Sequence, residues 1–182
     1  MSPLEDGAAG VIDESTGVNV NVDVSGSLVT IDVVHYHIHQ GKHFFIDDWA
    51  AVSGAGTIFD LLLITGGTKY VHFRREFEAQ DAFTFELYEA PTTSGGTGIT
   101  IYNNNRISAT AATVTAVSAP TVTALGTLLQ RDQLSAGSKV GGGSVQGEDL
   151  ILKQSTKYLF RFTKTNSGAS TVDYKLQWYE VP

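Results

Sequence analysis

The sequence has 182 residues, of which 42% are hydrophobic and 17% charged, with a formal net charge of −7 and no cysteine. This length suits one domain with a buried core, or one domain with an arm. The 12 Lys and Arg against 19 Asp and Glu argue against nucleic acid as a partner, because phosphate binding needs a basic patch. The lack of cysteine excludes disulfides and cysteine-bearing metal sites.

We expect no membrane association and no secretory signal. The longest candidate apolar run, residues 61–64, is far shorter than the roughly 20 residues that cross a bilayer. Residues 1–10 lack the apolar segment of a secretory signal. The charged share is below the roughly 25% usual in soluble domains, which is typical of a protein that covers part of its surface with partners.

The N-terminal residues differ in composition from the rest of the chain. Residues 1–17 are small, polar and acidic, and we expect them to form an extended N-terminal arm. From residue 18 to residue 24, valines alternate with Asn and Asp, which predicts the first strand. The predicted organisation is therefore an arm at 1–17 followed by one domain at 18–182.

Apolar and polar residues alternate with a period of two through most of the domain, and no long segment has a helical period. This pattern predicts an all-β fold: an antiparallel, jelly-roll-like β-sandwich of about nine or ten strands. The strands expected after the first are 28–39, 57–65, 69–77, 83–88, 98–102, 110–117, 158–163 and 172–179.

Two glycine-rich segments lie between the predicted strands. Gly95–Gly98 lacks the lysine of a phosphate-binding loop and is interpreted as a hairpin turn. Residues 125–149 are predicted to form a long connection that contains a glycine-rich loop at 137–147. That loop is either a projecting contact loop or a flexible connector, and the sequence does not decide between them.

Histidines alternate along one predicted strand. His35, His37 and His39 would lie on one face of a strand at 28–39, and His43 follows closely. Imidazoles placed in this way can share a metal ion. The segment is weakly similar to the metal motif of cupins, but His43 stands where that motif has Glu, and His72 is the only other histidine.

The opposite face of that predicted strand favours another interpretation. Val34, Tyr36 and Ile38 are expected in the core, which turns the histidines toward solvent or a neighbouring subunit. We favour this interpretation over a metal site, so the histidines at 35, 37 and 39 are interface candidates. If they met at a symmetry axis, the interface would respond to pH.

The remaining polar motifs do not form a complete catalytic set. Glu86 and Glu89 are paired carboxylates, interpreted as solubilising groups on a wet face. Asp47-Asp48 falls short of a calcium cage. Asn103 to Arg106 is expected to be a polar turn in which Arg106 is solvated or grips a neighbouring subunit. We therefore expect a protein that is not an enzyme and that has no cofactor and no small-molecule substrate.

A series of short motifs runs from residue 12 to residue 180. They are IDESTG at 12–17, HIHQGKHF at 37–44, KYVHF at 69–73, ELYEA at 86–90, YNNNR at 102–106, LGTLL at 125–129, the segment 151–161 and WYE at 178–180. Their order resembles that in a widespread group of tailed-phage virion proteins, small jelly-roll proteins described as capsid decoration or cement proteins, or as head fibres. The chain departs from the group's patterns at His37, where Glu is usual, and at Asn104, where Arg is usual.

The resemblance implies a structural role on the virion. It implies a homo-oligomer, expected to be a trimer, that binds the major capsid protein on the capsid surface after assembly in the host cytoplasm. Two alternatives stay open. One is a head fibre or tail receptor-binding protein that uses Tyr88 and Tyr179 on wet faces, and the other is a cupin-like metal-binding protein built on the histidines.

Overall fold

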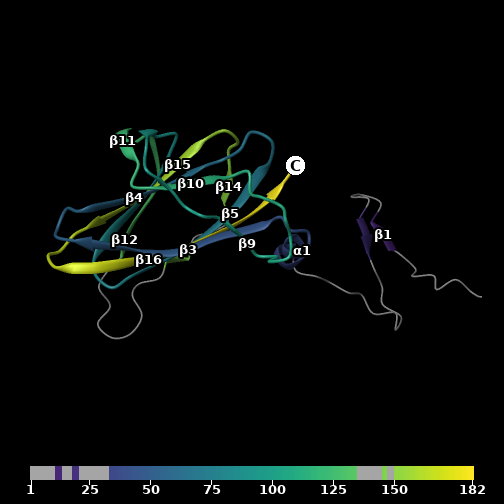
Figure 1. Cartoon of the computed structure of the whole chain (residues 1–182), viewed down its shortest axis with the longest axis horizontal. Helices are drawn as coiled ribbons and strands as arrows, with labels where there is room; N and C mark the ends of the chain where they lie inside the picture. The colour runs from purple at the N-terminus through teal and green to yellow at the C-terminus, as the bar shows by residue number, and fades with distance from the viewer. Residues whose placement is uncertain (1–10, 14–17, 21–32, 135–144, 147–149) are drawn as a thin grey trace, which may run out of the picture. The chain divides into compact units, whose positions relative to one another are not determined.

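Antiparallel strands make up most of the described part of the chain in the computed structural model, which covers residues 11–13, 18–20, 33–134, 145–146 and 150–182 (Figure 1). Contacts within the chain divide it into two units, Met1–Tyr36 and His37–Pro182. The predicted all-β sandwich is confirmed in the second unit. No helix of the described residues has the length and apolar character needed to cross a membrane.

The first unit contains a short hairpin. Strand β1 (Val11–Asp13) pairs antiparallel with β2 (Val18–Val20), with Val11 opposite Val20. This pairing joins residues on both sides of the division predicted after residue 17, and that division stays a prediction. Residues 1–10, 14–17 and 21–32, which include most of the predicted arm, lie outside the described residues.

The second unit contains two large antiparallel sheets and one small one. The first sheet has the order β12 (Thr127–Leu134), β6 (Phe83–Glu89), β15 (Lys157–Lys164), β4 (Ile58–Ile64), β10 (Thr115–Ser118) and β8 (Thr97–Gly98). The second has the order β13 (Val145–Gln146), β5 (Tyr70–Ala79), β16 (Ala169–Val181), β3 (His43–Ser53) and β9 (Tyr102–Asn103), and β14 (Leu150–Leu152) also pairs with β5. The small sheet pairs β11 (Thr121–Ala124) with β7 (Thr92–Ser94).

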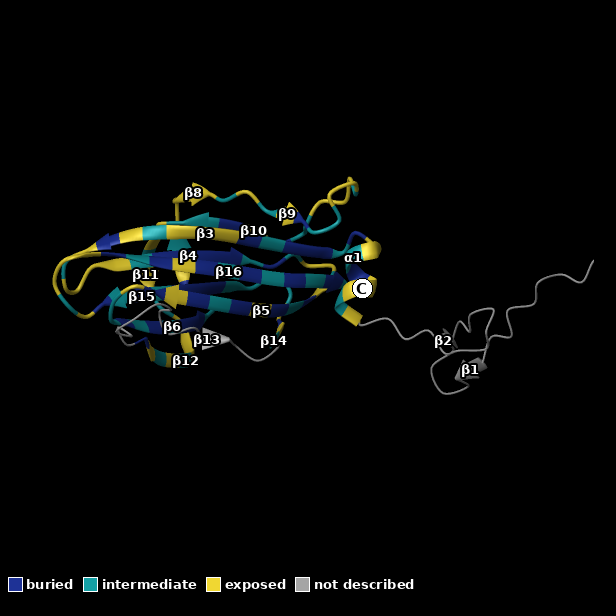
Figure 2. Ribbon diagram, turned by 90° about the horizontal axis from the view of Figure 1, so that it is seen from below, coloured by how far each residue is buried: buried dark blue, intermediate teal, exposed yellow. Residues whose placement is uncertain are grey.

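The core lies between the two large sheets and is rich in aromatic rings. Phe73 and Phe77 of the second sheet contact Phe160 and Phe162 of the first, with ring centroids 5.4 Å apart for Phe73–Phe160 and 4.9 Å apart for Phe77–Phe162. Burial alternates along β5 and β16, as Figure 2 shows, because a strand sends successive side chains to opposite faces. Period-two patterning is thus the feature that places the sandwich core.

Several strands of the described residues were not predicted, and the two longest of them are β3 and β12. β3 was missed because Asp47, Asp48 and Trp49 are all exposed, which interrupts the alternation. β12 lies in the predicted connection 125–149 and was missed because most of its side chains are exposed at the edge of the sheet. The glycine-rich loop lies outside the described residues, apart from residues 145–146.

Two predictions around the glycine turn were also wrong. β7 and β8 flank Gly95 and Gly96 but pair with β11 and β10, so this turn passes between sheets and is not a hairpin turn. The predicted strand 98–102 is divided between β8 and β9, which belong to different sheets. The chain passes so close to β10 here that a Cβ on Gly96 would collide with Val117.

The histidine segment is helical, which corrects the prediction of a strand at 28–39. Helix α1 spans Val33–His39, and residues 28–32 lie outside the described residues. At its end the amide of Lys42 donates to the carbonyl of His37 and the amide of Gly41 donates to that of Ile38, both at 2.9 Å. This is a Schellman cap, and Gly41 adopts the left-handed φ of 65° that the cap requires. The glycine after the last histidine is the signal that ends a helix rather than a strand.

Candidate functional site at the histidine end of the second sheet

Three aromatic side chains form a row across neighbouring strands of the second sheet. Tyr179 of β16 lies opposite His43 of β3 and His72 of β5. Their chain neighbours Phe44, Trp178 and Phe73 belong to the core, so the row faces away from it. His43 is nevertheless buried.

One side chain of α1 covers this row. The His37 ring stacks on Tyr179 with centroids 4.3 Å apart and planes at 17°, and His72 stacks on the same ring at 4.5 Å and 9°. His37 is the buried residue of α1. We call the set His37, His43, His72 and Tyr179 the histidine cluster.

Burial and positive neighbours favour the neutral imidazoles. Burial lowers the pKa of His37, and the positive charges of Lys42 and His72 lower it further. Burial also lowers the pKa of His43; the nearby Asn104 side chain opposes this effect, while the charges of His37 and Arg74 add to it. A proton on either imidazole is therefore less favourable here than on a histidine in water.

The helix separates the predicted histidine candidates. A helix turns about 100° per residue, so residues 35 and 39 share a face and residue 37 points elsewhere. His35 and His39 are exposed, whereas His37 is buried. The expectation that all three point outward is wrong for His37, and the expectation of a core position is wrong for Tyr36, which is 49% exposed. Among the described residues, no group of three or more His, Asp or Glu side chains is arranged to hold a metal ion.

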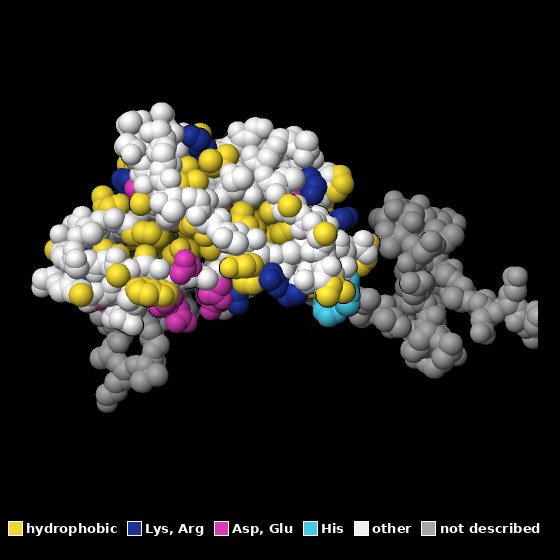
Figure 3. Space-filling view, in the orientation of Figure 1, with side chains coloured by type: hydrophobic (Ala, Val, Ile, Leu, Met, Phe, Trp, Pro, Cys, Tyr) yellow, Lys and Arg dark blue, Asp and Glu magenta, His cyan; other side chains and the backbone are white. Residues whose placement is uncertain are grey.

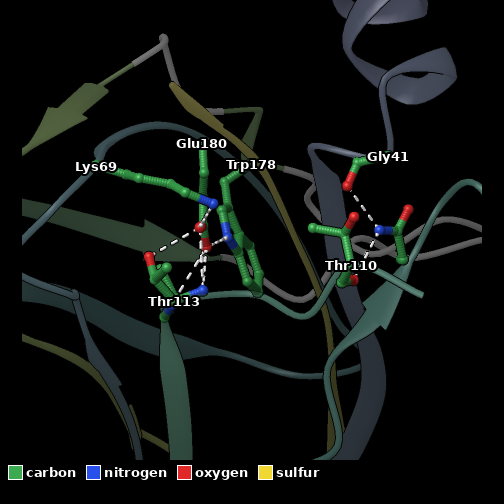
Figure 4. A network of polar contacts seen from close by, with 8 residues as sticks. Gly41, Lys69, Thr110, Thr113, Trp178 and Glu180 are labelled. Atoms are coloured by element: carbon green, nitrogen blue, oxygen red, sulfur yellow. Dashed lines mark hydrogen bonds and ion pairs between the residues drawn. The ribbon is translucent and has the colours of Figure 1, made fainter. Parts of the chain in front are cut away.

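The asparagine turn fastens α1 to the sheet. The buried Asn103 amide donates to the carbonyls of Gly41 at 2.8 Å and Thr110 at 3.1 Å, and both acceptors are labelled in Figure 4. The Asn105 side chain donates to the carbonyl of His39 at 3.2 Å. The backbone amide of Asn104 donates to the carbonyl of His43 at 2.9 Å. Each of the three asparagines therefore donates a hydrogen bond to a backbone carbonyl near the junction of α1 and β3.

The tip of this turn is exposed and partly apolar. Arg106 lies over the Tyr102 ring, with its guanidinium carbon 5.2 Å from the centroid, and Tyr102 packs on Phe45 at 5.6 Å. Ile107 is 95% exposed. The predicted polar turn is confirmed, and an interface role for Arg106 stays a prediction. We call residues 102–108 the Asn loop.

A buried carboxylate lies near this end of the core. Glu180 accepts hydrogen bonds from the backbone amides of Thr113 (2.8 Å) and Val114 (3.2 Å), the Thr113 hydroxyl (2.8 Å) and the Trp178 indole (3.2 Å). Lys69 forms an ion pair with it at 3.4 Å (Figure 4). The sequence motifs did not single out Glu180, although its place two residues after the core residue Trp178 on one strand indicates that it points inward.

The paired carboxylates belong to charge pairs between strands. A row of alternating charge, Asp60–Arg161–Glu86–Arg131, crosses β4, β15, β6 and β12. Arg161 binds Asp60 with two hydrogen bonds, at 2.7 and 2.8 Å, and Arg131 pairs with Glu86 at 2.6 Å. Glu89 pairs with Lys153 at 2.7 Å and accepts a hydrogen bond from the Tyr158 hydroxyl. These partners give both glutamates a structural role, in place of the predicted freely solvated one.

The outer face of the second sheet is acidic. Asp47, Glu76, Glu78 and Asp173 line a shallow depression around Lys175, and acidic side chains gather at the surface in Figure 3. Asp47 and Asp48 are both exposed in the middle of β3, and Asp47 is the one of the two that lines the depression.

The tyrosines that supported receptor binding do not lie on open faces. Tyr88 is buried in a small apolar cluster with Leu62 and Leu159, which corrects its predicted wet position. Tyr179 is half-buried between imidazoles. Comparison with protein families, curated proteins and solved structures finds no match for this chain.

Proposed function

We propose that this chain is a non-enzymatic virion structural protein that decorates and stabilises a phage capsid. It would act as a homo-oligomer, expected to be a trimer, bound to the major capsid protein on the capsid surface. The order of motifs from residue 12 to residue 180 supports this proposal through its resemblance to capsid decoration proteins. The β-sandwich is a suitable scaffold for the role, although many binding proteins share it.

The observation that carries the proposal is the Asn loop. Hydrogen bonds from Asn103 and Asn105 fix its base, while Ile107 projects from it almost fully exposed. A fixed loop that presents an apolar tip loses little conformational entropy when it binds a protein surface. Symmetric copies of such a weak contact gain strength together, which suits a protein that holds a shell.

The test is sedimentation of the full chain with shells assembled from the major capsid protein of the phage that encodes it. The wild-type chain should sediment with the shells and raise the temperature at which they disassemble. No binding by the wild-type chain would overturn the proposal.

A matched pair of variants tests the role of the Asn loop. Ile107→Asp should weaken shell binding about tenfold or more, as at interface positions that dominate binding energy. Ile151→Asp is the control, because Ile151 is a 63% exposed isoleucine on β14. Equal binding of the two variants to the shells would show that the Asn loop is not part of the interface with the shell. The oligomeric state, measured by light scattering, should be the same for both variants.

A further inference from the structure

The histidine cluster holds a short helix through a side chain whose charge depends on pH. Helix α1 has seven residues, which is too few for a stable isolated helix in water. Its buried side chain is His37, which stacks on Tyr179. The stack of His37 on Tyr179 is therefore one of the contacts that hold α1 on the sheet, beside the hydrogen bond from Asn105 to the carbonyl of His39.

Among the described residues, the charged groups that shift the pKa values of His37 and His43 come from several elements and are cationic. Lys42, in the turn after α1, and His72, on β5, act on His37. Arg74, also on β5, and His37 itself act on His43 of β3. The Asn104 side chain is the polar group that favours a charged His43. A proton added to the cluster therefore meets other positive charges in a partly buried site, and electrostatic repulsion is strong there.

We propose that α1 is a pH-sensitive element, which is docked on the sheet at neutral pH and released when protons enter the histidine cluster at mildly acidic pH. Released imidazoles become solvated and separate their charges, which the docked stack does not allow. The C-terminal cap at Gly41 and the bonds from the Asn loop keep the chain attached at the start of β3.

The direction of the pH dependence follows from proton linkage. With α1 on the sheet, burial and neighbouring positive charges hold the pKa of His37 below the ordinary value of 6.5, and the charge of His37 adds to the lowering of the pKa of His43. The released state therefore binds more protons than the docked state below about pH 6.5. Docking is at full strength above that pH and weakens as the pH falls through the window below it, by on the order of tenfold per pH unit for each linked proton.

The proposal concerns this chain's own fold and does not depend on the proposed capsid function.

Hydrogen exchange of the full chain tests the proposal. Amides of α1 should be protected at pH 7.5, and their protection factors should fall on the order of tenfold between pH 6.5 and 5.5. Amides of β16 should keep their protection over the same range. Constant protection of α1 from pH 8 to pH 5 would overturn the proposal, and this test needs no variant.

Variants identify the group responsible. His37→Phe keeps a ring for stacking and cannot gain a proton, so α1 should stay protected down to pH 5. His39→Phe is the control on the same helix, since His39 is exposed, and it should show the wild-type pH dependence. An unchanged pH dependence in His37→Phe would contradict the proposal. If that variant fails to fold, His72→Phe, which removes the other stacked imidazole, should reduce the fall in α1 protection between pH 6.5 and 5.5. A fall as large as in the wild type would contradict the proposal that the histidine cluster controls α1.

Discussion

Removal of the Glu180 side chain should destabilise the sandwich more than removal of any exposed carboxylate. In Glu180→Ala, the buried Val114 amide and Trp178 indole lose their acceptor, and so do both donors of the half-buried Thr113. A buried donor left without a partner costs about 1–3 kcal/mol. Lys69 is partly exposed and can turn to water, so it adds little. The expected loss is about 3–5 kcal/mol in the free energy of unfolding.

Thermal and denaturant unfolding measure this loss. For a chain of this length, each kcal/mol lowers the melting temperature by about 2–4 °C, so a drop of roughly 10 °C is expected. Glu180→Gln keeps one acceptor oxygen and should lose less. Glu78→Ala is the control, because Glu78 lies exposed on the outer face of β5, and it should melt within about 2 °C of wild type. A similar melting temperature for Glu180→Ala and Glu78→Ala would show that the hydrogen bonds to Glu180 do not stabilise the sandwich.

Three further predictions follow from other parts of the structure. Gly41→Ala should cost roughly 1–3 kcal/mol, because it strains a left-handed residue and places a Cβ against Ser108, whereas Gly56→Ala, also left-handed but in open space, should cost less in the same unfolding assay. The hydrogen bond to buried Lys164, followed by those to Asn166 and the backbone of Ala82, lowers the pKa of Asp81 from 3.8 to about 2. The stabilising effect of ionised Asp81 is therefore present above pH 4 and is lost as the pH falls toward 2. Lys164→Met should flatten that part of the curve of unfolding free energy against pH, and an unchanged curve would show that the Asp81–Lys164 pair does not stabilise the fold. Deletion of residues 1–17 should weaken shell binding in the sedimentation assay and leave the melting temperature of the sandwich unchanged, and undiminished binding would show that the arm is dispensable.

The sequence was sufficient for strands in which every second residue is buried. β5 and β16 follow that pattern, because each has one face in the core and the other outside it. β6 and β15 follow it except at Tyr88 and Leu159, which are buried in the second apolar cluster on the opposite face. β3 departs from it, because its middle carries three exposed residues in a row. Local alternation predicts a strand only where both of its faces meet different environments.

The histidine segment shows the limit of local patterning. The order His-Tyr-His-Ile-His alternates like a strand, yet residues 33–39 form a helix. The deciding features are the cap at Gly41, which is local, and the stack of His37 on Tyr179, which is not. The cluster itself depends on the registers of β3, β5 and β16, and no single segment of the sequence encodes these registers.

The sequence predicted a polar turn at residues 103–106, but it did not predict which groups the asparagine side chains bind. Consecutive asparagines indicate a turn, and residues 103–106 form one. The acceptors of their side chains are the carbonyls of Gly41, His39 and Thr110, two of which lie about 60 residues away in sequence. This long-range role was visible only once the fold was known.

Imaging of the whole phage particle by electron cryo-microscopy tests the proposed capsid role most directly. The account predicts density for the β-sandwich in symmetric groups on the outer capsid surface, with the Asn loop against the major capsid protein. Density for this chain at the tail or at a fibre, or a particle from which the chain is absent, would contradict it.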